Sequence, residues 1–110
     1  MNKEKVKRGI RKIIRECEYD ELYKVCFLEF VCNRIKNSCY SITDKDKIHD
    51  WREWHENEMW EKIVNLYNEN NIMPYTLNGV EFYNILYDVY KWKLEKYCKK
   101  QEKLWENDNE

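Results

Sequence analysis

The C-terminal third of the chain carries a repeat of apolar and aromatic residues that is typical of a long helix. Between residues 80 and 104 the repeat positions follow each other at alternating intervals of three and four. This heptad spacing puts all of them on one helix face. They are Val80, Tyr83, Tyr87, Tyr90, Leu94, Tyr97, Gln101 and Leu104. We therefore predict a helix over residues 79–105, roughly 38 Å long at 1.5 Å per residue.

A second apolar stripe accompanies only the first half of this segment, and it consists of Phe82, Ile85, Val89 and Trp92. The first half is therefore expected to contact neighbours on two sides and to pack inside the protein. A compact domain of this length is roughly 35 Å across. The end of the helix is thus expected to project, offering Leu104 and Trp105 to a partner.

Three further helices are predicted, over residues 3–18, 20–36 and 44–69. In the first, one narrow stripe holds Val6, Ile10, Ile13, Ile14 and Cys17. The second has Asp20 as its predicted N-cap and is apolar almost all round, which favours a place in the middle of a bundle. A loop is expected over residues 68–78, and Asn78 with Glu81 resembles a cap for the last helix.

These elements predict an all-α fold, with residues 1–110 forming a single domain of about four helices and a short charged tail at 106–110. Two glycines and one proline are too few for most sandwiches and barrels, which need many turns. Residues 39–42 and 72–77 leave open a minor two-stranded β element.

Charge is distributed unevenly along the chain, although the formal net charge is only -1. Residues 1–15 hold seven positive charges and one negative, whereas residues 44–61 hold seven negative and three positive. The basic candidates for a nucleic acid or an acidic partner are Arg8, Arg11, Lys12, Arg15, Lys96, Lys99, Lys100 and Lys103. The four residues of the first predicted helix form one basic face, and the four lysines of the last predicted helix form another. The alternative for both basic faces is a solvated helix surface. If the two faces lie side by side, a nucleic-acid groove is favoured; if the acidic third helix separates them, it is not.

Two tryptophans of the third predicted helix are further candidates for binding a partner. Trp54 falls on its polar side, next to Trp51 on the apolar stripe. An exposed Trp would suit a binding anchor, because Trp is enriched in interface hot spots. The alternative is that another helix covers it. With Leu104 and Trp105, these tryptophans complete the set of partner-binding candidates.

Catalytic and ligand-binding patterns find little support in the sequence. Neither Ser38 nor Ser41 lies in a nucleophile-elbow motif, and two glycines cannot build a phosphate-cradling loop. His49 and Glu53 stand four residues apart without further identifiable metal ligands. The five cysteines lack CxxC spacing and are expected to be buried free thiols. We therefore predict no enzyme activity, no cofactor and no metal.

The functional prediction is a small cytoplasmic helical module for protein–protein interaction. No apolar segment is long enough for a bilayer, so no membrane partner is expected. Alanine is absent while Tyr alone occurs nine times, which indicates an AT-rich genome such as that of a low-GC bacterium or its phage. A phage or mobile-element protein that binds and inhibits or modulates a host complex, as anti-defence proteins do, fits this description. The alternatives are a nucleic-acid-binding protein and a homodimer formed through residues 94–105.

Overall fold

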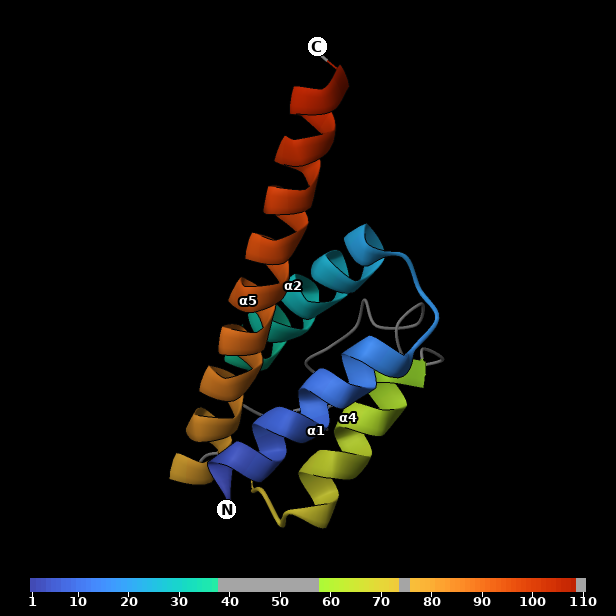
Figure 1. The fold of residues 1–110 in the computed structure, drawn as a ribbon. Helices are drawn as coiled ribbons and strands as arrows, with labels where there is room; N and C mark the ends of the chain where they lie inside the picture. The colour runs from blue at the N-terminus through green and yellow to red at the C-terminus, as the bar shows by residue number, and fades with distance from the viewer. Residues whose placement is uncertain (38–57, 74–75, 109–110) are drawn as a thin grey trace.

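The computed structural model describes residues 1–37, 58–73 and 76–108, and four helices lie within these ranges (Figure 1). They are α1 (Lys3–Glu16), α2 (Glu21–Asn37), α4 (Glu58–Glu69) and α5 (Leu77–Asp108). No strand occurs among the described residues, so the all-α prediction is confirmed. Residues 39–42 and the first part of the predicted third helix, 44–57, lie outside the described ranges. The second half of the predicted β element contributes no strand where it is described, and Leu77 already belongs to α5.

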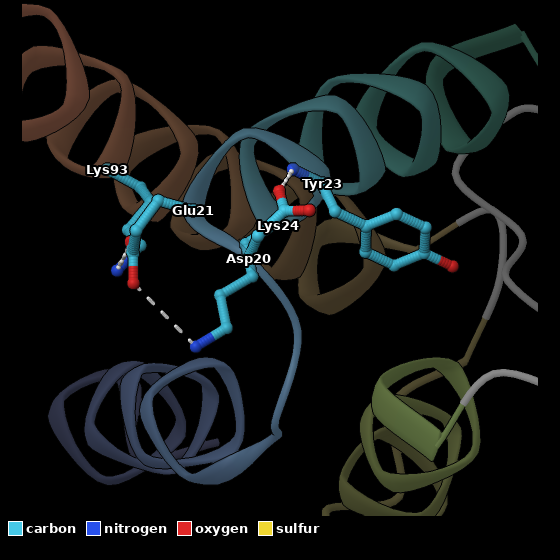
Figure 2. A network of polar contacts seen from close by, with 5 residues as sticks. All are labelled: Asp20, Glu21, Tyr23, Lys24 and Lys93. Carbon is cyan, nitrogen blue, oxygen red and sulfur yellow. Dashed lines mark hydrogen bonds and ion pairs between the residues drawn. The ribbon is translucent and has the colours of Figure 1, made fainter. Parts of the chain in front are cut away.

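Side-chain caps explain where the first two helices begin. The backbone N–H of Lys5 donates to the side-chain oxygen of Asn2 over 3.1 Å at the start of α1. Asp20 accepts the N–H of Tyr23 over 2.7 Å at the start of α2 (Figure 2). Each cap satisfies one of the backbone donors that a helix leaves unpaired in its first turn. The prediction of Asp20 as the N-cap is confirmed.

The start of α5 differs from the prediction by two residues. Its cap is the hydroxyl of Thr76, which accepts the N–H of Gly79 over 3.3 Å. The same hydroxyl donates to the carbonyl of Met73 over 2.6 Å and so fixes the entering chain. Thr76 is thus the N-cap of α5, and the prediction of Asn78 as the cap was wrong.

The C-terminus of α4 ends in a left-handed residue and leads directly into the turn before α5. Asn71 has a φ of 53°, in the region that Asn tolerates better than most residues. The N–H of Ile72 then donates to the carbonyl of Tyr67 over 3.2 Å, as in a Schellman ending. This turn returns the chain to the core, where Ile72 is buried.

The first half of α5 lies against both α1 and α2, and α1 also packs against α4 (Figure 1). Within the described part of the chain, α5 rather than α2 therefore takes the central position. One side of α2 is open, because Leu22 and Cys26 are exposed. Close contact between α1 and α4 is possible at Gly9, where a Cβ would lie 3.2 Å from the Leu66 methyl carbons.

The buried face of α5 is the second stripe of the sequence rather than the heptad stripe. The buried side chains of α5 are Phe82, Ile85, Leu86 and Val89. Of the heptad positions in this half, Tyr83 and Tyr90 are half-buried and Tyr87 is exposed. Tyr83 and Tyr90 nevertheless pack against the core beside this stripe, so the prediction that the first half contacts neighbours on two sides and packs inside the protein is confirmed. The predicted stripe of α1 is confirmed, with Val6, Ile10, Ile14 and Cys17 buried.

The second half of α5 extends past the other helices (Figure 1). The helix has 32 residues, which correspond to about 48 Å. The molecule measures 52 × 30 × 23 Å, so α5 accounts for most of its longest dimension. From Glu95 to Glu106 every side chain except that of Tyr97 is exposed. The expected projection of the helix end is present.

Candidate functional site

The two predicted basic faces meet at Trp92, on the side where α1 packs against α5. The guanidinium carbon of Arg11 lies 4.8 Å from the centroid of the indole ring. From α5 itself, the Nζ atoms of Lys96 and Lys93 lie 4.5 Å and 5.9 Å from the same centroid. Three cations therefore surround one aromatic ring, whose negative faces attract them.

These residues line a pocket of about 290 Å³ between α1 and α5, which we call the Trp92 pocket. Arg11, Ile14 and Arg15 come from α1, and Trp92, Lys93 and Lys96 come from α5. On α1, Arg11 lies three and four positions before Ile14 and Arg15, and on α5, Lys96 lies three and four positions after Lys93 and Trp92. Such spacing brings side chains to one helix face. Four of the six are cationic, so the pocket attracts anions.

Glu21 neutralises one edge of this cationic region (Figure 2). Its carboxylate lies 2.5 Å from Nζ of Lys93 and 4.0 Å from Nζ of Lys24, whose side chain is almost entirely buried. The hydrogen bond from Lys93 holds the pKa of Glu21 below its ordinary value, against an opposing effect of burial. The pair also ties the start of α2 to the middle of α5.

Among the described residues, the remaining cations of the pocket have no such partner. Within the described ranges, no carboxylate forms an ion pair with Arg11, Arg15 or Lys96. The Nε atom of Arg11 is moreover buried and has no hydrogen-bond partner there. A buried donor without an acceptor costs free energy, so this nitrogen adds to the strain of holding Arg11 among other cations.

The other two basic candidates of α1 are not part of the pocket. Lys12 lines a hollow of about 360 Å³ between α1 and α4, together with Glu16, Lys62 and Glu69. Arg8 is exposed. The described part of α4 packs against α1 and does not separate Arg11 and Arg15 from α5. Residues 44–57, which hold most of the acidic side chains of the predicted third helix, lie outside the described ranges.

The lysines of the projecting half extend the basic surface along α5. A shallow depression of about 350 Å³ is lined by Lys96, Lys99, Lys100 and Lys103. Lys99 is partly neutralised by Glu95, whose carboxylate lies 2.9 Å from its Nζ, and this hydrogen bond raises the pKa of Lys99. The basic surface therefore runs continuously from α1 to Lys103.

The apolar partner-binding candidates have different outcomes. Leu104 and Trp105 lie on the projecting end of α5, where 49% and 70% of their surfaces are exposed. Trp51 and Trp54 lie outside the described residues. The first two thus lie where the sequence analysis expected them.

The cysteines only partly follow the expectation of buried thiols. Cys17 and Cys32 are buried, and burial raises the pKa of Cys32 to about 12. Cys26 and Cys98 are exposed, so the expectation was wrong for them, while Cys39 lies outside the described ranges. Among the described residues, no three His, Cys, Asp or Glu side chains cluster in a way that would hold a metal ion.

Two residues of the Trp92 pocket were not identified as site residues from the sequence. Trp92 was attributed to the second apolar stripe, and Lys93 was not among the basic candidates. A signal was nevertheless available: Trp92 and Lys96 stand four residues apart on a helix, as do Arg11 and Arg15. That spacing allows a cation–π contact within α5 and two guanidinium groups on one side of α1.

The described residues define a helical bundle with a cationic pocket and a projecting helix end. Comparisons with protein-family models, curated proteins and solved structures found no match to this chain. In the parts of the chain that are described, no helix has the length and apolar character needed to cross a membrane.

Proposed function

We propose that this protein is a helical interaction module that binds another protein through the projecting half of α5. The supporting observation is the exposure of Leu104 and Trp105, at 49% and 70%, on a helix end that extends beyond α1, α2 and α4. Trp dominates the energetics of many protein interfaces. This activity is binding, and it requires no catalytic group.

The charges beside the exposed stripe favour a partner other than a second copy. In heptad terms the stripe continues through Leu94, Tyr97 and Leu104, and the flanking positions carry Lys91, Lys93 and Lys100. None of the flanking positions between residues 91 and 105 is acidic. A second copy therefore offers no complementary charge, and an antiparallel pair would bring lysines together. A helix with acidic flanks suits this surface better than homodimerisation through residues 94–105.

The biological setting that we propose is inhibition or modulation of a host complex in the cytoplasm by a phage or mobile-element protein. Its support is the composition, which lacks alanine and contains 9 Tyr among 110 residues, as an AT-rich genome would produce. A small module of this kind acts by occupying a surface of its partner.

The proposal is tested by the paired substitutions Leu104→Ser and Trp105→Ala in one variant. The matched control is Leu22→Ser, because Leu22 is 51% exposed on α2, close to the 49% of Leu104. Affinity capture from cells of the native host is compared for wild type, variant and control. We expect the double variant to lose a specific partner that the wild type and the control retain, with no fall in the thermal midpoint. Equal recovery of that partner by the double variant would contradict the proposal.

Nucleic-acid binding is a second candidate function, supported by the meeting of Arg11 and Arg15 with Lys93 and Lys96. Electrophoretic mobility shifts with DNA and RNA at two salt concentrations test it. Binding by phosphate contacts should weaken steeply as salt rises, because counterions are released on association. An unshifted band at the lower salt concentration would remove this candidate.

A further inference from the structure

The Trp92 pocket has features of a site that is organised before a ligand arrives. Arg11 and Arg15 belong to α1 while Lys93 and Lys96 belong to α5, so two packed helices fix the distance between the cations. Trp92 lies among them, with the Arg11 guanidinium carbon 4.8 Å and the Lys96 Nζ 4.5 Å from its ring centroid. The attraction of the ring offsets part of the repulsion between these like charges.

The positive charge of the pocket exceeds what the described carboxylates neutralise. Glu21 pairs with Lys93, whereas Arg11, Arg15 and Lys96 have no carboxylate partner among the described residues. The buried Nε of Arg11 also lacks an acceptor there. An anion in the pocket would relieve the repulsion between its cations.

The donor set matches a phosphate group better than a carboxylate. Two guanidinium groups and an unpaired ammonium offer more donors than the two oxygens of a carboxylate accept, and phosphate has more oxygens and can carry a second charge. Arginine side chains bind phosphate through two parallel hydrogen bonds, and lysine adds a point charge. A volume of about 290 Å³ is ample for one or two phosphate groups.

We propose that the Trp92 pocket is a phosphate-binding site in which Arg11 and Arg15 of α1 and Lys96 of α5 hold the phosphate oxygens. Trp92 positions the Arg11 guanidinium, and Glu21 limits the affinity by engaging Lys93. Phosphate binding at this site does not require the proposed binding of a partner protein at the end of α5. The site uses the same residues as the second candidate function, nucleic-acid binding. The phosphate belongs either to a free compound or to a nucleic-acid strand, and the test distinguishes these sources.

Calorimetric titration at low salt with two probes, pyrophosphate and a single-stranded oligonucleotide without terminal phosphates, tests the proposal on the full chain. The pocket variants are Arg11→Gln and Lys96→Gln; Lys96 is exposed, so its variant keeps the test valid if the Arg11 variant does not fold. The controls are Lys12→Gln, which faces α4, and Lys91→Gln, which lies over Tyr87. Each removes the same charge outside the pocket.

We expect each pocket variant to weaken binding at least tenfold, while the controls weaken it by about twofold. Glu21→Gln should tighten binding, because it releases Lys93. Pyrophosphate binding alone identifies a free phosphate compound as the ligand and removes the nucleic-acid function. Oligonucleotide binding with the same dependence on Arg11 and Lys96 identifies a strand phosphate. Equal weakening by the pocket and control variants would overturn the proposal but would leave nucleic-acid binding through other cations as a candidate function. Failure of both probes to bind would also overturn the proposal.

Discussion

The two halves of α5 belong to one uninterrupted helix but have opposite surroundings. The first half buries Phe82, Ile85, Leu86 and Val89 against α1 and α2, and the second half exposes almost every side chain from Glu95 to Glu106. The first half is therefore held by burial of apolar surface, and the second by its own hydrogen bonds and local pairs such as Lys99 with Glu95. A single regular helix can thus serve as scaffold in one half and as binding surface in the other.

The largest expected contrast is in thiol reactivity, between α2, which packs on α5, and the second half of α5. Cys32 of α2 is buried, with its pKa raised to about 12, and Cys98 lies exposed on the second half of α5. Raising a thiol pKa from 9.0 to about 12 lowers its thiolate fraction about a thousandfold near pH 8. Alkylation followed by peptide mass spectrometry should label Cys98 at least a thousandfold faster than Cys32. Comparable rates would mean that the packing of α2 on α5 opens readily.

A matched pair of leucine substitutions should separate the halves in stability. Leu86→Ala removes a side chain that is fully buried, and we expect it to lower the free energy of unfolding by about 2–5 kcal/mol. Leu104→Ala removes the same atoms from an exposed position, with an expected change within about 0.5 kcal/mol. Urea titrations followed by circular dichroism measure both. A large loss from Leu104→Ala would place the projecting half within the cooperative unit.

The smallest expected effect concerns Glu21, which joins α2 to Lys93 where the two halves of α5 meet. Its pKa is lowered in the folded protein, mainly by the hydrogen bond from Lys93. The stabilisation is therefore present above the ordinary value of 4.5 and is lost as the pH falls through the lowered pKa. Because Glu21 is 42% exposed, the contribution should be below about 1 kcal/mol. Thermal midpoints of wild type and Glu21→Gln should differ near neutral pH and converge in acid; a constant difference would contradict this assignment.

The sequence predicted the helices well because their signals are local. The Asp20 cap and the α1 stripe at Val6, Ile10 and Ile14 depend on residues within one or two turns. The choice between the two stripes of α5 depends instead on where α1 and α2 lie. The sequence placed both stripes of this half inside the protein, but it could not show that the face carrying Phe82 is the more deeply buried one, because tyrosines at heptad spacing suit a core or a surface equally.

The candidate sites also divide into one that local sequence features predict and one that depends on tertiary packing. Exposure of Leu104 and Trp105 followed from helix length and domain size, which the sequence provides. The convergence of Arg11 with Lys96 at Trp92 brings together residues about 80 positions apart, and no pattern along the chain encodes it. The cap of α5 was also predicted at the wrong residue, Asn78 instead of Thr76. The hydroxyl of Thr76 also donates to the carbonyl of Met73 in the preceding turn, and the cap pattern in the sequence does not include that contact.

The continuity of α5 has a consequence for how its two candidate surfaces influence each other. Lys96, Lys100 and Lys103 lie on the same segment as the exposed Leu104 and Trp105. A helical segment of this length without tertiary support has only marginal stability in water, so a partner that binds its end also orders the lysines. Binding at the helix end would then influence the Trp92 pocket through Lys96 alone, since Arg11, Arg15 and Trp92 are held by the packing of α1 on α5, and any such influence would be reciprocal.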